Sequence, residues 1–194
     1  DIGFSMSKSM IDMNKKNECN FNYEIITGYP QYKTTDEIKT KSKLIRNNLL
    51  SEGVEKIVCV FDENSTNDNR WHTGNELQAE NYENILLELL KNNKLGVIFK
   101  PKNYATLKER LGDVGKLLDE CINTKRCYIF SEVNNDTIKT TKALPLLAAL
   151  ASDLVIHSHL CAGTAGIETA LKKIPTILID REKSKDSLLY NILN

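Results

Sequence analysis

The stretch DLVIHSHLCAGTAGIETALKKIPTILID, residues 153–180, decides the fold because it predicts a strand, a helix and a second strand in succession. The segments 153–158 and 175–180 are short strand-like runs with apolar residues at their centres. The segment 166–173 between them has helical composition. We therefore expect a βαβ unit whose two strands are parallel.

The same alternation extends over most of the chain. Further strands are expected at 23–27, 56–62, 96–102 and 126–132, and helices at 36–51, 76–93, 106–124 and 142–152. Gly112 and Gly115 interrupt the third of these helices, and Pro145 suits the first turn of the fourth. The pattern predicts an α/β fold, a Rossmann-like three-layer α/β/α arrangement with a mainly parallel sheet.

The domain organisation follows from the same pattern. Residues 1–22 carry no clear period and are expected to be a stub or interdomain segment, followed by one Rossmann-like domain at 23–194 that ends in a partial helix. The chain starts with DIGFSMSKSM, which has neither an initiator methionine nor a signal-peptide pattern, so we expect a piece of a longer protein.

Composition narrows the class of protein. Lys and Arg number 26, as do Asp and Glu, and this zero net charge argues against nucleic acid as a partner. No apolar run approaches the roughly 20 residues that span a bilayer. The five cysteines form no CxxC pair, which disfavours a disulfide framework or zinc ribbon and favours a reducing, cytoplasmic setting. Cys59, within an apolar run, is expected to be a small buried side chain.

Polar side chains follow the expected strands, where parallel sheets bind their ligands. Lys100 and Lys102 could neutralise a diphosphate as point charges, and Ser158 and His159 follow the strand at 153–158. Solvated loop residues are the alternative interpretation. In the long polar loop 63–75, Arg70, Trp71 and His72 could contact a base or an acceptor, or Trp71 could anchor the loop to its own domain.

The AGTAG turn predicts an anion site. Gly163 and Gly166, on either side of Thr164 and Ala165, would let the backbone approach a ligand, and a helix starting near Gly166 would direct free N–H groups at a phosphate. Glu168, in the first turn, could accept hydrogen bonds from a ribose diol. The alternative is a threonine N-cap with a favourable first-turn charge.

A metal site is not predicted. His157, His159 and Cys161 alternate along an extended segment and could lie on one side, but the sequence shows no fourth ligand nearby. A histidine here could instead contact a phosphate, orient a sugar or be satisfied within the core.

The segment ALASDLVIHSHLCAGTAGIETALKKIPTILID resembles the donor-site segment of GT-B glycosyltransferases and of their relatives, the UDP-N-acetylglucosamine 2-epimerases. The matching residues are Ala151, Ser152, Asp153, Gly163, Thr164, Ile167, Glu168, Ala170, Pro175 and Ile177. In GVIFKPKN, Lys100 and Pro101 match the family's strand end, whereas Lys102 replaces the usual histidine and Lys173 the usual glycine. The resemblance covers residues 56–180, and transferases of bacterial surface polysaccharide synthesis are most similar.

The resemblance implies one half of a GT-B fold that binds a nucleotide sugar, with Glu168 on the ribose and residues 163–166 facing the diphosphate. It also implies a missing N-terminal domain, a carbohydrate or lipid-linked acceptor, and no metal or other cofactor. Asp62, His72 and His159 are the candidates for a catalytic base, which the missing domain could also supply. The intact enzyme is expected in the cytoplasm, and a peripheral position at the inner face of the membrane stays open.

Three alternatives remain at this level. A 2-epimerase would use the same donor site, and a non-catalytic nucleotide-binding or interaction domain would bind without reaction. A receiver-like domain would explain an aspartate, Asp62, at a strand end, but the other acidic residues and the lysine of a receiver do not follow in the expected order.

Overall fold

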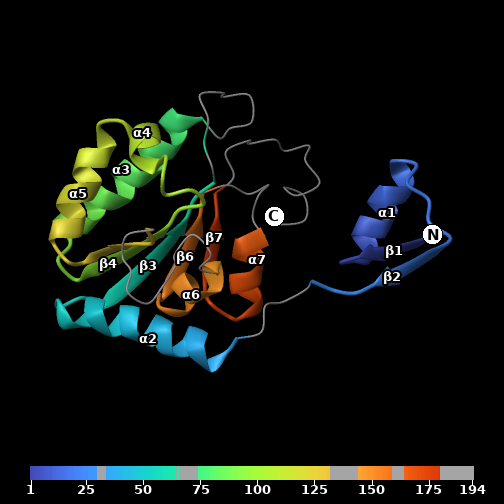
Figure 1. The fold of residues 1–194 in the computed structure, drawn as a ribbon, viewed down its shortest axis with the longest axis horizontal. Helices are drawn as coiled ribbons and strands as arrows, with labels where there is room; N and C mark the ends of the chain where they lie inside the picture. Colours follow the sequence, from blue (N-terminus) through green and yellow to red (C-terminus); the bar gives the residue numbers. More distant parts are fainter. Residues whose placement is uncertain (30–33, 64, 66–73, 132–143, 159–163, 180–194) are drawn as a thin grey trace. The chain divides into compact units, whose positions relative to one another are not determined.

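The computed structural model describes residues 1–29, 34–63, 65, 74–131, 144–158 and 164–179. The chain forms two compact units, Asp1–Thr35 and Asp36–Asn194, and each is described by itself (Figure 1). No helix within the described ranges is both long enough and apolar enough to cross a bilayer.

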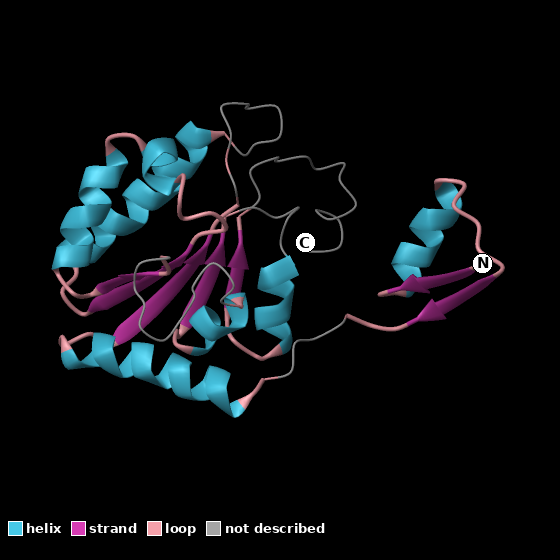
Figure 2. Cartoon of the chain, in the orientation of Figure 1, coloured by secondary structure: helices cyan, strands magenta, loops and turns pink. Residues whose placement is uncertain are grey.

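The larger unit is built on a five-stranded parallel sheet with the order β5-β4-β3-β6-β7. Its strands are β3 (Lys56–Phe61), β4 (Leu95–Lys100), β5 (Cys127–Ile129), β6 (Leu154–His157) and β7 (Thr176–Leu178). Its helices are α2 (Asp36–Ser51), α3 (Asn75–Lys91), α4 (Leu107–Leu111), α5 (Val114–Asn123), α6 (Pro145–Leu150) and α7 (Thr164–Leu171). Figure 2 shows helices on both sides of the sheet.

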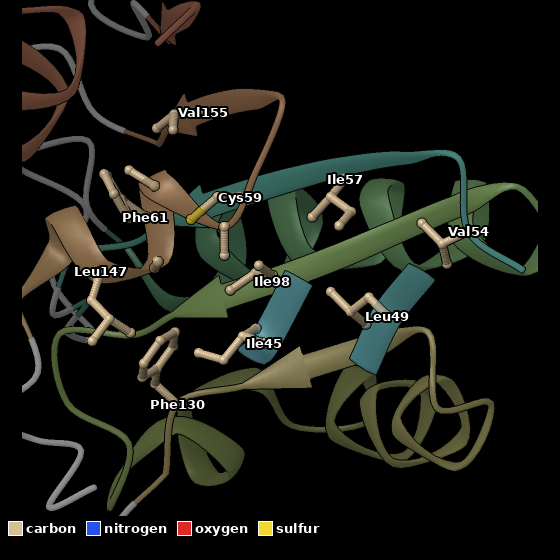
Figure 3. Close-up of a cluster of buried hydrophobic side chains, with 13 residues drawn as sticks. Ile45, Leu49, Val54, Ile57, Cys59, Phe61, Ile98, Phe130, Leu147 and Val155 are labelled. Atoms are coloured by element: carbon tan, nitrogen blue, oxygen red, sulfur yellow. The ribbon is translucent and has the colours of Figure 1, made fainter. Parts of the chain in front are cut away.

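Two apolar cores, one on each face of the sheet, make this unit a three-layer α/β/α structure. Ile57, Cys59 and Phe61 of β3 pack with α2 and α6, as the cluster in Figure 3 shows. Val60, the alternate residue, packs with α3, α4 and α5. Because successive side chains of a strand point to opposite faces, a strand buried on both faces needs a continuous apolar run. The predicted fold class and the burial of Cys59 are both confirmed.

The strand order produces a topological switch point between β3 and β6. From β3 the chain passes through α3 to β4 on one side, and from β6 it passes through α7 to β7 on the other. Helix α3 belongs to one core, whereas Ala165 of α7 packs against the other, so the two helices leave from opposite faces. Open α/β sheets bind their ligands at such a point, outside the carboxyl ends of the strands.

Two predicted local signals are confirmed, and two others need correction. The helix expected at 106–124 breaks at Gly112, which has φ +54°, but Gly115 lies inside α5, so the predicted interruption at Gly115 is wrong. Pro145 begins α6. Helix α7 begins at Thr164, two residues before the expected start near Gly166, and it has no acidic residue in its first turn. The interpretation of Glu168 as a first-turn charge is therefore wrong.

The smaller unit contains β1 (Ile2–Ser5), α1 (Lys8–Lys16) and β2 (Tyr23–Ile26), and the two strands are parallel. Ser7 caps α1 by accepting a hydrogen bond from the Met10 N–H at 3.2 Å. The segment 23–26 is a strand as expected, but it pairs with residues 2–5 instead of joining the larger sheet. The boundary between the units thus lies at Thr35, whereas the sequence predicts it at residue 22, because the sequence does not reveal the pairing partner of β2.

Candidate functional site

The carboxyl ends of β3, β4 and β6 bring together most of the polar residues that we predicted there. Asp62 and Glu63 follow β3, Lys100 ends β4, and Ser158 follows β6. The Ser158 N–H donates to the Phe61 carbonyl at 3.1 Å, which fixes the end of β6 beside the end of β3. These residues therefore lie at the edge of the switch point.

Asp62 points into the protein, where both of its carboxylate oxygens accept hydrogen bonds. Its side chain is 4% exposed. Oδ2 accepts from Gln78 Nε2 at 2.6 Å and from the Tyr82 hydroxyl at 3.0 Å, while Oδ1 accepts from the Lys102 N–H at 2.5 Å. A carboxylate with these three donors positions the loop that carries Lys102. The arrangement favours this positioning role over the predicted role of general base, which needs an oxygen available to an acceptor.

Arg110 extends the same buried network to α4. Its Nη1 donates to Gln78 Oε1 at 3.0 Å and to Ser65 Oγ at 2.9 Å, and its Nη2 donates to the Asn103 carbonyl at 2.8 Å. The side chain is 9% exposed. These hydrogen bonds offset the cost of burying the guanidinium charge. The network thus joins the residues that follow β3 with those that follow β4.

Burial shifts the pKa of two groups at this edge. Burial raises the pKa of Asp62 to about 6, and the hydrogen bond from Lys102 and the charge of Arg110 oppose this shift. Burial also lowers the pKa of Lys100 from its ordinary value, while the Asp62 carboxylate acts in the opposite direction. The Lys100 Nζ donates to the Pro101 carbonyl at 3.0 Å. Lys100 is thus largely enclosed, and Lys102 is the more accessible of the two predicted lysines.

Glu63 connects the ends of three strands through its carboxylate. Oε2 lies 2.5 Å from the Lys102 Nζ, and Oε1 lies 3.8 Å from Nε2 of His157, the last residue of β6. The Glu63 side chain is 16% exposed, whereas that of Lys102 is 59% exposed. An acid, an ammonium group and an imidazole therefore meet at the switch point.

Helix α7 starts on the same connection from β6, and its residues differ in exposure. Thr164, the first residue of the helix, is exposed, and Ala165 is half-buried. The first residues of an α-helix form the positive end of its dipole, and in α7 these are Thr164, Ala165 and Gly166. This start is the part of the predicted phosphate site that lies within the described residues.

Gly166 and Glu168 occupy surroundings that differ from the prediction. A Cβ atom at Gly166 would lie 2.6 Å from Leu178 Cδ2 and 3.5 Å from the His157 Cβ, so the glycine lets α7 approach the sheet. The resemblance instead predicts that Gly166 faces a diphosphate. Glu168 is 2% exposed and lies in the second turn of α7. Contact between its carboxylate and a ribose thus requires a rearrangement around it.

The remaining predicted site residues, His72, His159 and Gly163, lie outside the described residues, as do Cys161 and the segment from Arg70 to Trp71. Within the described ranges, no three His, Cys, Asp or Glu side chains are grouped so that they could hold a metal ion.

Three residues of the site were not selected from the sequence: Gln78, Tyr82 and Arg110. Two of them carry a signal that could have been used. Gln78 precedes Tyr82, Leu86 and Leu89 on the buried face of α3, and Arg110 follows Leu107 on the buried face of α4. A polar or charged residue at an apolar position of a helix indicates a buried partner, because burial without one is costly.

Comparisons with known proteins identify no similar protein. No family model matches the chain, and neither the curated proteins nor the solved structures contain a match to it. The class that the structure defines is therefore an α/β domain with a three-layer arrangement and a polar switch point.

Proposed function

We propose that this chain contains the donor-binding domain of a GT-B-type glycosyltransferase. The domain binds a nucleotide-diphosphate sugar at the carboxyl ends of β3, β4 and β6, and the intact enzyme transfers the sugar to a carbohydrate or lipid-linked acceptor. The observation that carries the proposal is the switch point between β3 and β6, where Lys102 and the start of α7 supply groups that bind anions.

The charges at this edge favour an anionic ligand. Among the described residues of the network, Lys100, Lys102 and Arg110 are cationic, against the two carboxylates Asp62 and Glu63. Three positive groups less two negative groups leave one positive charge, to which the positive end of α7 adds. A diphosphate between Lys102 and α7 would be stabilised by both.

The chemistry that follows needs no group beyond the two substrates and a base. The acceptor hydroxyl oxygen forms a bond to the anomeric carbon, and the bond from that carbon to the diphosphate oxygen breaks. The electron pair stays on the departing nucleotide diphosphate, where Lys102 and the α7 amides stabilise the charge. The hydroxyl proton passes to a general base. His72, His159 and the missing domain remain the candidates for this base, since Asp62 is enclosed by its hydrogen bonds.

The smaller unit supports the proposal that a further domain contributes to the enzyme. On one face of its sheet, Ile2, Phe4, Tyr23 and Ile25 are exposed, with Phe4 at 67% and Tyr23 at 70%. Parallel sheets are found with both faces covered, and an isolated two-stranded sheet is marginally stable. We propose that the acceptor-binding domain implied by the family resemblance packs against this face.

Calorimetric titration of the 194-residue chain with UDP, GDP, CDP and CMP tests the donor site. We expect one nucleoside diphosphate to bind in the millimolar range or more tightly. Thr164→Val should weaken that binding about fivefold, the equivalent of about 1 kcal/mol for one hydrogen bond. Glu168→Ala should weaken it as well if a ribose reaches that carboxylate. Absence of binding throughout the panel would refute the donor site.

The rival activities give different results. A 2-epimerase converts a UDP-sugar without any acceptor, whereas the proposed transferase releases nucleotide diphosphate only when an acceptor is present. Incubation of the intact protein with the UDP-sugar alone separates these two reactions. Nucleotide binding without either reaction would indicate a non-catalytic binding domain.

A further inference from the structure

The ion pair between Glu63 and Lys102 lies where the proposed ligand would bind. Glu63 Oε2 is 2.5 Å from the Lys102 Nζ, and Glu63 Oε1 is 3.8 Å from His157 Nε2. The two basic groups come from the ends of different strands, β4 and β6, on either side of β3. One carboxylate thus faces a basic group from each neighbouring strand.

A carboxylate in this position resembles the anionic group of a ligand. Ammonium groups at a strand end bind phosphate oxygens and carboxylate oxygens through the same charge-assisted hydrogen bonds. The Glu63 side chain is only 16% exposed and therefore sits within the edge, whereas the ammonium-bearing Lys102 side chain is 59% exposed and can reach a ligand from solvent. An incoming phosphate and the Glu63 carboxylate would compete for this ammonium group.

We propose that Glu63 is an internal competitor of the anionic ligand, occupying Lys102 until a ligand phosphate displaces it. This inference rests on the proposed function, because it assigns a role within the same site. It makes Glu63 a residue that sets ligand affinity: only a ligand whose anionic group offsets the loss of the ion pair binds well. Removal of the Glu63 charge should consequently strengthen binding, whereas removal of an ordinary binding residue weakens it.

The size of the effect follows from the exposure of the pair. Ion pairs with a largely exposed partner contribute little, so Glu63→Gln should tighten binding by about three- to fivefold at low salt. The same substitution also removes repulsion between the carboxylate and a ligand phosphate, which acts in the same direction. The difference in affinity between Glu63→Gln and wild type should shrink at about 0.5 M salt, because salt screens interactions between exposed charges.

Inorganic pyrophosphate is the appropriate probe, because its binding does not depend on the nucleotide base. Calorimetry on the full 194-residue chain would compare wild type, Glu63→Gln, Lys102→Gln and the double variant. Lys102→Gln should cost more affinity in the Glu63→Gln background than in wild type, since Lys102 is released there. Glu37→Gln is the matched control, because Glu37 Oε1 also lies 2.5 Å from a lysine, Lys41, but on α2.

Each outcome decides the inference. Tighter pyrophosphate binding by Glu63→Gln, with no change in Glu37→Gln, supports it. Unchanged or weaker binding overturns it, and so does an absence of pyrophosphate binding in both wild type and variant. Binding of a nucleoside diphosphate with no gain in Glu63→Gln leaves the proposed function standing and removes only the competitor role. Tighter pyrophosphate binding by Glu63→Gln, with no binding of any nucleotide, would support the competitor role and refute the nucleotide-sugar function. Should Glu63→Gln fail to fold, Glu63→Ala gives the same comparison.

Discussion

Replacement of Asp62 by alanine tests whether the buried network holds the edge of the switch point together. The substitution removes the acceptor of three hydrogen bonds, from Lys102 N–H, Gln78 Nε2 and the Tyr82 hydroxyl. These donors then lie in a region where Tyr82 is 1% and Gln78 6% exposed. The charge of Arg110 also loses a neighbouring carboxylate.

The cost can be worked out from these contacts. A buried donor without an acceptor costs about 1–3 kcal/mol, and removal of one member of a buried charged network costs roughly 3–5 kcal/mol. We therefore expect Asp62→Ala to lower the free energy of unfolding by about 3–5 kcal/mol. Asp62→Asn keeps the volume and can still accept from Gln78 and Tyr82, but its amide then faces the Lys102 N–H. It should cost about 1–3 kcal/mol.

Urea unfolding followed by far-ultraviolet circular dichroism measures both losses, with the midpoint shifting at an unchanged slope. Asp113→Ala is the control, because the Asp113 side chain is 95% exposed and its ion pair with Lys116, at 3.0 Å, is on the surface. It should change stability by less than about 0.5 kcal/mol. A loss below about 1 kcal/mol for Asp62→Ala, similar to the control, would refute the positioning role that we assign to Asp62.

Three further outcomes concern the fold and its charges. Gly96→Ala should lower the free energy of unfolding by about 1–3 kcal/mol, because its Cβ would lie 2.8 Å from Val54 Cγ1 and 3.5 Å from the Arg126 carbonyl and would overpack the site. In urea unfolding, adding Val54→Ala should recover part of this loss. Tyr82→Phe should cost about 1 kcal/mol in the same assay, since it loses the bond to Asp62 but keeps the stacking on Phe99 at 4.4 Å. Burial alone would raise the pKa of Asp153, but hydrogen bonds from the Ile57 N–H and from Arg46 lower it. The ionised Asp153 therefore stabilises the fold above about pH 4, and this stabilisation is lost as the pH falls further. The stability of Asp153→Asn, measured over the same acid range, should not show this loss.

The sequence was sufficient to predict the sheet of the larger unit, because burial on both faces leaves a readable pattern. Ile57, Cys59 and Phe61 serve one core and Val60 the other, so the run from 57 to 61 has to be apolar throughout. The helix break at Gly112 was equally readable, since its φ of +54° suits glycine. Parallel strands then placed Asp62, Lys100 and Ser158 at one edge.

The direction of individual side chains could not be predicted in this way. Asp62 turns inward because Gln78 and Tyr82, 16 and 20 residues later, offer donors there. Gly166 packs against Leu178, which belongs to the next strand. The pairing of β2 with β1 depends on a strand at residues 2–5, and four residues are too few to show a hydrophobic period in the sequence. Each of these features is set by a tertiary contact that local composition does not encode.

Mapping of amide chemical shifts during titration with the tightest-binding nucleoside diphosphate tests the central claim most directly. The account predicts that the largest changes fall on Glu63, Lys102, Ser158 and Thr164, which belong to the carboxyl ends of three strands and the start of α7. Changes centred on the amino ends of the strands, on the smaller unit, or nowhere at millimolar ligand would contradict the assignment of the ligand site to the switch point.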